Sequence, residues 1–352
     1  MRSRGVRIAG AVASLVIGAV LIAVALPKVA GVDWGAIGTQ FGALDAPTVL
    51  WLVVLWLAGL WAYTYVLTGS LPGLTNAQAL TLNATGSAVS NVLPFGGAAG
   101  VALTFAMAGS WGHARRAVAV STLVTGVWNT LARMALPALG LLALVAAGRV
   151  PDERMTVAAE VAAVSLAAVL ALTVAVLAWG GAAPAIGRAV DAVVRVLPGR
   201  WRPRPGRAGE ALRSLRAGTV DIVRRGWRKM TIGMVAYLGL QGVLFAACLS
   251  ATGAHVGFGE MVAAFALGRL LTTAVVTPSG VGVSENGTVA LLVALGCPAA
   301  PVAAAVLLFA FFTYAIEIPL GGLGWLAWVS VRRWRVAPAR PHSVPQKVEA
   351  AS

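Results

Sequence analysis

The stretch Thr277-Pro278-Ser279-Gly280-Val281-Gly282-Val283-Ser284-Glu285 interrupts an apolar run that extends over about residues 261–296. Proline removes a backbone donor and clashes with the preceding helical turn, and glycine permits backbone conformations that other residues resist. We therefore expect a broken helix with free backbone amides beside the carboxylate of Glu285. Because irregular backbone inside a membrane is tolerated only where protein buries it or where it lines an aqueous cavity, this stretch is a candidate substrate site.

A second interruption occupies the matching place in the first half of the chain. Pro94 lies 184 positions before Pro278, in the sequence Asn91-Val92-Leu93-Pro94-Phe95-Gly96-Gly97-Ala98-Ala99-Gly100. It too breaks an apolar run, which covers about residues 77–108. Two interrupted hydrophobic segments in corresponding places of two halves are the best indication in a sequence of a transporter's binding site.

Composition places the chain among integral membrane proteins. Of its 352 residues, 59% are hydrophobic and only 11% are charged, and several apolar runs exceed the roughly 18 residues that indicate a membrane span. The net charge of +15 is typical of basic cytoplasmic loops, so we expect no nucleic-acid partner. The two cysteines and three histidines lack metal-binding spacing, and we expect no metal and no cofactor.

The apolar runs predict an all-α, polytopic membrane protein with six full spans. The spans are expected at about residues 8–26, 46–67, 117–147, 157–179, 231–249 and 302–329, and the interrupted segments at 76–108 and 258–296. Residues 1–150 form the first repeat, residues 151–335 the second, and residues 336–352 a disordered tail. A basic cytoplasmic loop is expected at residues 183–229 of the second repeat.

The distribution of positive charge favours a re-entrant hairpin over a single crossing for each interrupted segment. If each crossed once, a cytoplasmic N-terminus would place the basic residues 188–229 outside, against the positive-inside rule. If each turns back, both termini, Arg115, Arg116 and the basic segment are cytoplasmic. The halves then form inverted repeats, each of three full spans plus one re-entrant helical hairpin, a common plan of secondary transporters. We expect the hairpin tips, near residues 94–97 and 278–282, to face one another.

The segment 188–229 contains twelve basic and three acidic residues. Within it Leu212, Leu215 and Thr219 recur at helical spacing, with Arg213 and Arg216 between them. This pattern predicts an amphipathic helix on an anionic membrane surface. A nucleic-acid-binding arm is the less favoured alternative.

Four charged residues lie deep in apolar runs: Arg133, Arg269, Glu285 and Glu317. A single charge at the bilayer centre costs about 2.5–3.5 kcal/mol on insertion scales, so such residues usually face the protein interior and pair. Arg133 and Glu317 are 184 positions apart, which suggests related places near a two-fold axis. The four residues either bind a charged headgroup or couple protons, or they form structural ion pairs.

The expected substrate-binding set adds the residues of the two interruptions to these four. They are Asn91, Pro94, Gly96, Gly97, Pro278, Ser279, Gly280 and Gly282. Phosphate is expected to meet backbone amides at the tips, since helix N-termini favour anions. We expect Gly280→Leu to abolish transport with little loss of folded protein.

The two motifs, in this order, resemble the transmembrane region of lysylphosphatidylglycerol synthases over roughly residues 5–332. Pro278, Gly280, Gly282 and Glu285 carry the likeness in the second half, and Asn91, Pro94, Gly96 and Gly97 carry it in the first. The wider group is described as flippase-like, which implies movement of a lipid or lipid-linked polar group between leaflets. In the full synthases a soluble transferase follows the membrane region. Because the chain stops at Ser352, lysyl-lipid synthesis is not expected.

The function expected from the sequence is therefore a flippase for a phospholipid or polyprenyl-linked headgroup in the cytoplasmic membrane, and not an enzyme. One alternative is a membrane-embedded transferase that uses a polyprenyl-phosphate sugar. Its candidate acidic residues are Asp33, Asp45, Asp152 and Glu153. Another alternative is a membrane scaffold whose basic loop docks a cytosolic partner.

Overall fold

The computed structural model describes residues 4–93, 96–148, 164, 168, 207–272 and 277–330. Every regular element within these ranges is a helix. Five helical segments are long and apolar enough to cross a membrane: Val12–Ala30, Ala46–Ser70, Arg115–Ala146, Gly218–Ala251 and Ala299–Ser330. The protein is thus an all-α, multi-pass membrane protein, as the hydropathy predicts. Apart from positions 164 and 168, the span expected at 157–179 lies outside the described residues, as does the tail at 336–352.

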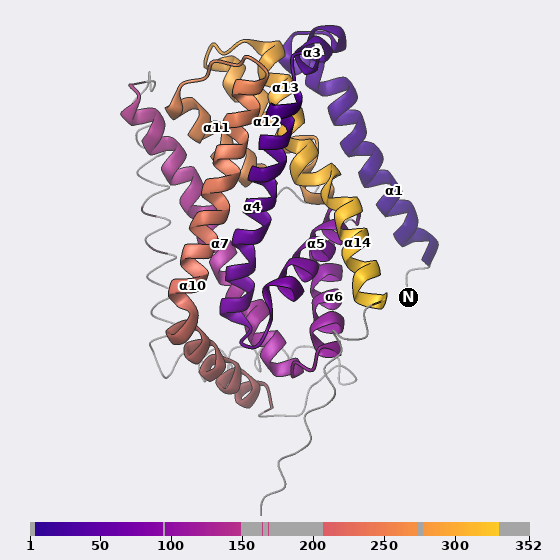
Figure 1. Ribbon diagram of the computed structural model, residues 1–352, viewed down its shortest axis with the longest axis vertical. Helices are drawn as coiled ribbons and strands as arrows, with labels where there is room; N and C mark the ends of the chain where they lie inside the picture. Colours follow the sequence, from indigo (N-terminus) through magenta and orange to yellow (C-terminus); the bar gives the residue numbers. More distant parts are fainter. Residues whose placement is uncertain are drawn as a thin grey trace, which may run out of the picture.

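The chain begins with α1 (Arg4–Val20), a π-helical turn η1 (Leu21–Ala25) and α2 (Leu26–Ala30), which together form one rod. A short helix, α3 (Trp34–Phe41), then precedes the long helix α4 (Ala46–Ser70). Figure 1 shows the first rod rising from the N-terminus to α3, and α4 descending from the same end of the molecule.

Two aspartates begin the helices of this first part. The Asp33 carboxylate accepts the amide of Ala36 at 2.7 Å, and the Asp45 carboxylate accepts that of Thr48 at 3.0 Å. Hydrogen bonds from Thr48 lower the pKa of Asp45. No helix was expected from the sequence between the spans at 8–26 and 46–67, and α3 is therefore an addition from the structure. It forms because Asp33 caps it and Ile37 is fully buried against the core, which stabilises even a short helix.

The first interrupted segment consists of two shorter helices, α5 (Asn76–Val92) and α6 (Gly96–Ser110). At Gly96 a β-carbon would lie 2.5 Å from the Cα of Ser90, so only glycine allows α6 to start this close to α5. The chain turns back there, and α6 descends next to α5 (Figure 1). The long helix α7 (Arg115–Ala146) follows after a short turn.

The described residues of the second half again contain a long helix followed by two shorter ones. They run through α10 (Arg207–Ala251), α11 (Phe258–Leu271), η3 (Pro278–Gly280), α12 (Val283–Ala294), α13 (Ala299–Ala310), η4 (Phe311–Ala315) and α14 (Glu317–Ser330). In Figure 1 the pair α5–α6 lies in the lower half of the molecule and the pair α11–α12 in the upper half.

The described part of the basic segment is helical from Arg207 and continues without a break into the next span. The resulting helix α10 is 45 residues long, where the sequence predicted a basic loop that contains an amphipathic helix, followed by a separate span. Arg224, Arg225 and Trp227 are exposed on this lower part of α10, whereas Ile222 packs against a small core around Met230. The rest of the segment, before residue 207, lies outside the described residues.

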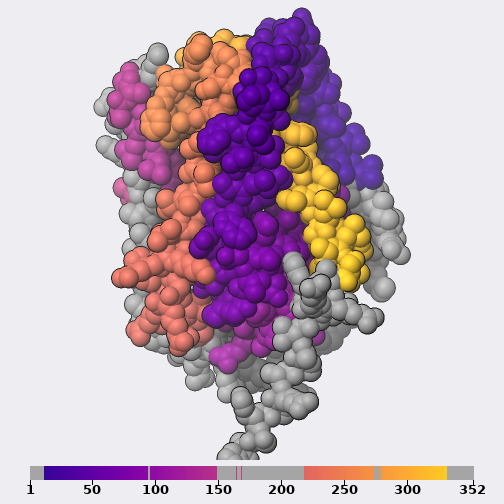
Figure 2. Space-filling view, in the orientation of Figure 1, coloured from indigo at the N-terminus to yellow at the C-terminus, as the bar shows by residue number. Residues whose placement is uncertain are grey.

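Close helix contacts are made through small residues. At Gly226 on α10 a β-carbon would meet the carbonyl oxygen of Gly69 on α4, so the two backbones touch, as is common between membrane helices. Figure 2 shows α4 filling the face between α10 and α14. The largest core lies at the end formed by α3, α11, α12 and α13, and includes Ile37, Leu292 and Val302.

Candidate functional site

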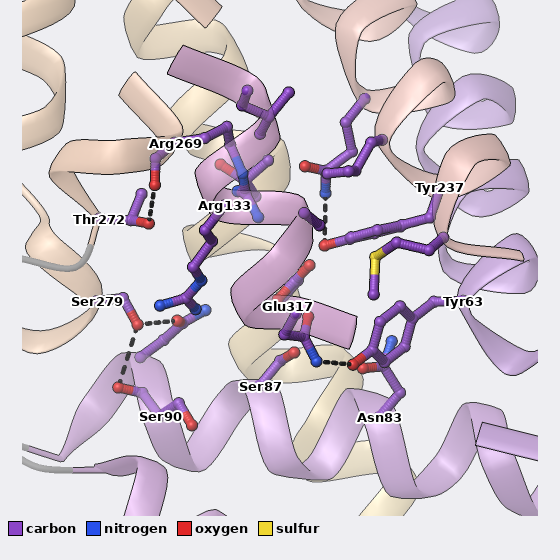
Figure 3. A pocket seen from close by; sticks show the side chains of 18 of the residues that line it. Tyr63, Asn83, Ser87, Ser90, Arg133, Tyr237, Arg269, Thr272, Ser279 and Glu317 are labelled. Carbon is purple, nitrogen blue, oxygen red and sulfur yellow. Dashed lines mark hydrogen bonds between the residues drawn. The ribbon is translucent and has the colours of Figure 1, made fainter. Parts of the chain in front are cut away.

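A cavity of about 520 Å³ lies at the centre of the bundle. Its walls come from α4, α5, α7, α10, α11, η3, η4 and α14, and most of the lining side chains are polar. These polar residues are Tyr63, Asn83, Ser87, Ser90, Asn91, Asn129, Thr130, Arg133, Tyr237, Gln241, Arg269, Thr272, Ser279, Thr313, Tyr314 and Glu317. Figure 3 shows many of these side chains pointing toward a common space.

Three of the four charged residues predicted from the apolar runs line this cavity: Arg133, Arg269 and Glu317. Glu317 is only 7% exposed. Ser87 and Asn91 lie within hydrogen-bonding reach of its carboxyl, and the positive charge that acts on it is that of Arg269. The 184-residue spacing related Arg133 and Glu317 by symmetry, and both residues line this one cavity.

Arg133 is the more exposed of the two arginines. One turn earlier on α7, the Asn129 amide nitrogen donates to the Tyr63 hydroxyl at 2.9 Å and to the Thr125 carbonyl at 2.8 Å. This contact fixes the wall from which Arg133 projects. The charge of Glu317 offsets that of Arg269. The cavity therefore has an excess of positive charge, which Arg133 supplies.

The two interruptions meet at the edge of the cavity. The Ser279 hydroxyl donates to the Asn91 side-chain oxygen at 2.7 Å and lies 3.3 Å from the Ser90 carbonyl oxygen. Ser279 has φ 51° and is the one non-glycine residue with positive φ in the part of the chain that the structure describes. Such a conformation costs of order 1–3 kcal/mol and persists where its surroundings enforce it. The expectation that the tips face one another is thus met at these residues.

Gly280 and Gly282 shape the second tip but do not line the central cavity. Both have positive φ, 74° and 86°. A β-carbon at Gly280 would lie 2.6 Å from the Leu271 carbonyl oxygen, and one at Gly282 would lie 2.6 Å from the Leu21 Cβ. They are therefore packing positions that let η3, which Pro278 begins, fit against α11 and the first rod.

Glu285 has a structural partner. Its carboxylate accepts the backbone amide of Gly282 at the start of α12, which forms a capping interaction. The residue is 3% exposed and lines a separate cavity of about 30 Å³ together with Arg269 and Tyr314. A space of this size is about that of one water molecule. Glu285 thus lies beside the central cavity, not in it.

The remaining predicted residues of the first interruption fall in different places. Asn91 lines the central cavity. Gly97 lines an adjoining cavity of about 320 Å³, which shares Tyr63, Asn83 and Ser87 with the central one. Gly96 is a contact between α5 and α6, and Pro94 lies outside the described residues.

Three of the four tyrosines of the chain line the central cavity, and sequence reasoning did not select them. The rings of Tyr63 and Tyr237 are 4.9 Å apart, and the Gln241 side-chain nitrogen donates to the Tyr237 hydroxyl at 2.9 Å. Tyrosine in membrane helices is usually found at the interfaces. The mid-span position of Tyr237 and Tyr314 was the signal that would have found them.

A π-helical turn precedes Glu317. The segment η4 (Phe311–Ala315) carries Thr313 and Tyr314 into the cavity wall. Single π-helical turns inside α-helices frequently occur at functional sites. Here the turn sets the direction in which Glu317 and Tyr314 leave the helix.

Comparison with known proteins identifies the family. No curated protein sequence matches the chain. A family described as "Lysylphosphatidylglycerol synthase TM region" matches residues 11–321. This range includes both interruptions and every residue of the central cavity. The chain therefore belongs to the family of the lysylphosphatidylglycerol synthase transmembrane region.

Proposed function

We propose that the protein moves a lipid, or a polar group carried on a polyprenyl chain, between the leaflets of the cytoplasmic membrane. The observation that carries this proposal is the charged, polar cavity of about 520 Å³ within apolar spans. Polar and ionisable groups inside a membrane are costly and usually mark a substrate pathway. The family is consistent with a role connected to membrane lipids.

The proposed headgroup is anionic. Arg133 and Arg269 face one carboxylate, that of Glu317, across the cavity. Arginine suits phosphate because its planar guanidinium donates two parallel hydrogen bonds. At the second tip the Gly282 amide already binds the Glu285 carboxylate. The arginines, rather than this helix N-terminus, are therefore the phosphate ligands in our proposal.

The fold would serve transport as a pair of inverted repeats with two re-entrant hairpins. Two contacts support this arrangement. Gly140 on α7 packs against Ala266 on α11, and Gly324 on α14 packs against Thr85 on α5. Gly140 and Gly324 are 184 positions apart, the same offset that relates Pro94 to Pro278. Each half thus covers the other half's hairpin in an equivalent way.

The structure also suggests a direction of access. The adjoining cavity of about 320 Å³ extends from the central one toward Leu71 and Leu74, at the turn between α4 and α5. The opposite end of the molecule holds the largest core. Arg115 and Arg116 begin α7 at the end with the cavity, and the positive-inside rule assigns that end, with both termini, to the cytoplasm. We infer that the protein is open toward the cytoplasm in this state.

A transferase role gains no support from the described acidic residues. Asp33 and Asp45 both cap helices with their carboxylates, and Asp152 and Glu153 lie outside the described residues. The proposal is therefore transport without catalysis. The exposed Arg224 and Arg225, with Trp227 beside them, fit an anionic membrane surface better than a protein partner of unknown kind.

Reconstitution tests the proposal. Vesicles containing the protein and fluorescent phosphatidylglycerol, or fluorescent polyprenyl phosphate, are treated with an impermeant quencher, and the protected fraction is followed over time. Transport predicts loss of protection above protein-free vesicles. If neither lipid exchanges faster than in empty vesicles, the proposal is wrong; transfer of sugar from a polyprenyl-phosphate donor would instead support the transferase.

A further inference from the structure

A fourth cavity, of about 600 Å³, lies between α6 and α7. We call it the α6–α7 groove. Phe105, Leu123, Val127 and Leu131 supply most of its apolar surface. The hydroxyl of Thr130, also in the lining, donates to the Gly126 carbonyl within its own helix at 2.9 Å, so it adds little polarity to the groove.

The groove is continuous with the central and the adjoining cavities. Gly126 and Thr130 line both the groove and the central cavity, and Thr122 lines both the groove and the adjoining cavity. These three residues are four apart along α7 and so form one stripe on the helix. Gly126 is the gap in this stripe, because a β-carbon there would meet no atom within 4 Å.

We propose that the α6–α7 groove holds a hydrocarbon chain of the same lipid molecule whose headgroup occupies the central cavity. The inference rests on the proposed function. A lipid whose headgroup enters a polar cavity must keep its chain in apolar surroundings, since exposure of apolar surface to water is unfavourable. The groove is a large, strongly apolar space that shares a wall with the cavity, so the lipid enters between the first hairpin and α7, and the chain passes Gly126.

Photochemical cross-linking tests this placement independently of transport. The probe is phosphatidylglycerol with a diazirine in one acyl chain, added to the reconstituted full chain, and the adducts are located by mass spectrometry. Leu139 and Leu142, which are 54% and 52% exposed on the same helix, report lipid at the outer surface. We expect several-fold more adducts at Phe105, Val127 and Leu131 than at this pair.

The headgroup must anchor the chain if both belong to one molecule. Arg133→Gln is therefore expected to lower groove adducts several-fold while leaving adducts at Leu139 and Leu142 unchanged. Gly126→Leu fills the gap in the stripe, where a β-carbon has open space, and should remove groove adducts and slow transport. Gly239→Leu is the matched control, because Gly239 is an exposed glycine of α10 with open space around it and lines none of the four cavities.

Each outcome decides between the two proposals. If lipid is transported but groove adducts do not exceed those at Leu139 and Leu142, or do not respond to Arg133→Gln, the chain does not lie in the groove. Normal transport by Gly126→Leu leads to the same conclusion. The opposite outcome is a protein that transports no lipid but whose groove adducts fall in Arg133→Gln. That result would support the groove as the binding site of the chain and would overturn the proposed function.

Discussion

The Ser279 hydroxyl donates a 2.7 Å hydrogen bond to the side-chain oxygen of Asn91, and this contact joins the two interrupted segments of the chain. The residues are 188 positions apart, and both line the central cavity. Asn91 also lies beside the Glu317 carboxyl. The contact between the tips is thus coupled directly to the charged part of the cavity.

Ser279→Ala should destabilise the protein by about 0.5–1.5 kcal/mol, the usual net contribution of one hydrogen bond. Ser279→Gly loses the same bond but relieves the positive φ, so it should cost less than the alanine variant. Thermal unfolding in detergent measures both. If the bond is made as described, Ser279→Ala and Asn91→Ala will be less than additive in a double-mutant cycle; full additivity would show that the tips do not interact.

Gly280→Ala should destabilise more than Gly296→Ala. Both positions have positive φ, which costs a non-glycine residue about 1–2 kcal/mol. At Gly280 the new β-carbon also meets backbone atoms at 2.6–2.7 Å, whereas at Gly296 nothing lies within 4 Å. The sequence led us to expect that Gly280→Leu would fold normally, and the burial of Gly280 revises this: folded yield should fall as well. Equal unfolding temperatures for the two alanine variants would contradict the packing.

Glu285→Gln should fold almost as well as the wild type, because a glutamine oxygen can still accept the Gly282 amide in the capping interaction. Glu285→Ala removes that acceptor and should cost about 0.5–2 kcal/mol. The two unfolding temperatures distinguish the cap from a charge-dependent role. A glutamine variant that unfolds as early as the alanine variant would mean that the charge itself stabilises the fold.

The proposed membrane orientation can be read from cysteine labelling in intact cells. Gly109→Cys places a thiol in the last turn of α6, where there is open space, and the native Cys297 lies at the turn between α12 and α13, at the other end of the molecule. An impermeant thiol reagent added outside should label Cys297 and spare position 109. The reverse pattern would invert the orientation, and labelling of both would disprove re-entrant hairpins.

The sequence predicted the interruptions and the buried charges well because proline, glycine and ionised groups are costly in an apolar helix. It also predicted that the two tips meet, because the two breaks occupy matching positions 184 residues apart. It related Arg133 to Glu317 without deciding whether they pair, because an offset identifies symmetric positions and not contacts. It missed α3, whose stability depends on burial of Ile37, and the cavity tyrosines, whose directions depend on helix rotation and on η4. Neither quantity is visible in hydropathy.

The central claim, that an anionic headgroup passes through the cavity, is tested most directly by removing its two arginines together. The variant Arg133→Gln, Arg269→Gln is compared with Arg224→Gln, Arg225→Gln, which removes the same charge from exposed positions on α10. Both are reconstituted with fluorescent phosphatidylglycerol, and leaflet exchange is measured with the impermeant quencher at equal amounts of folded protein. The account predicts that the cavity variant loses exchange at least tenfold, as the loss of about 1.4 kcal/mol of binding would produce, while the surface variant keeps it. Wild-type exchange by the cavity variant would contradict the account.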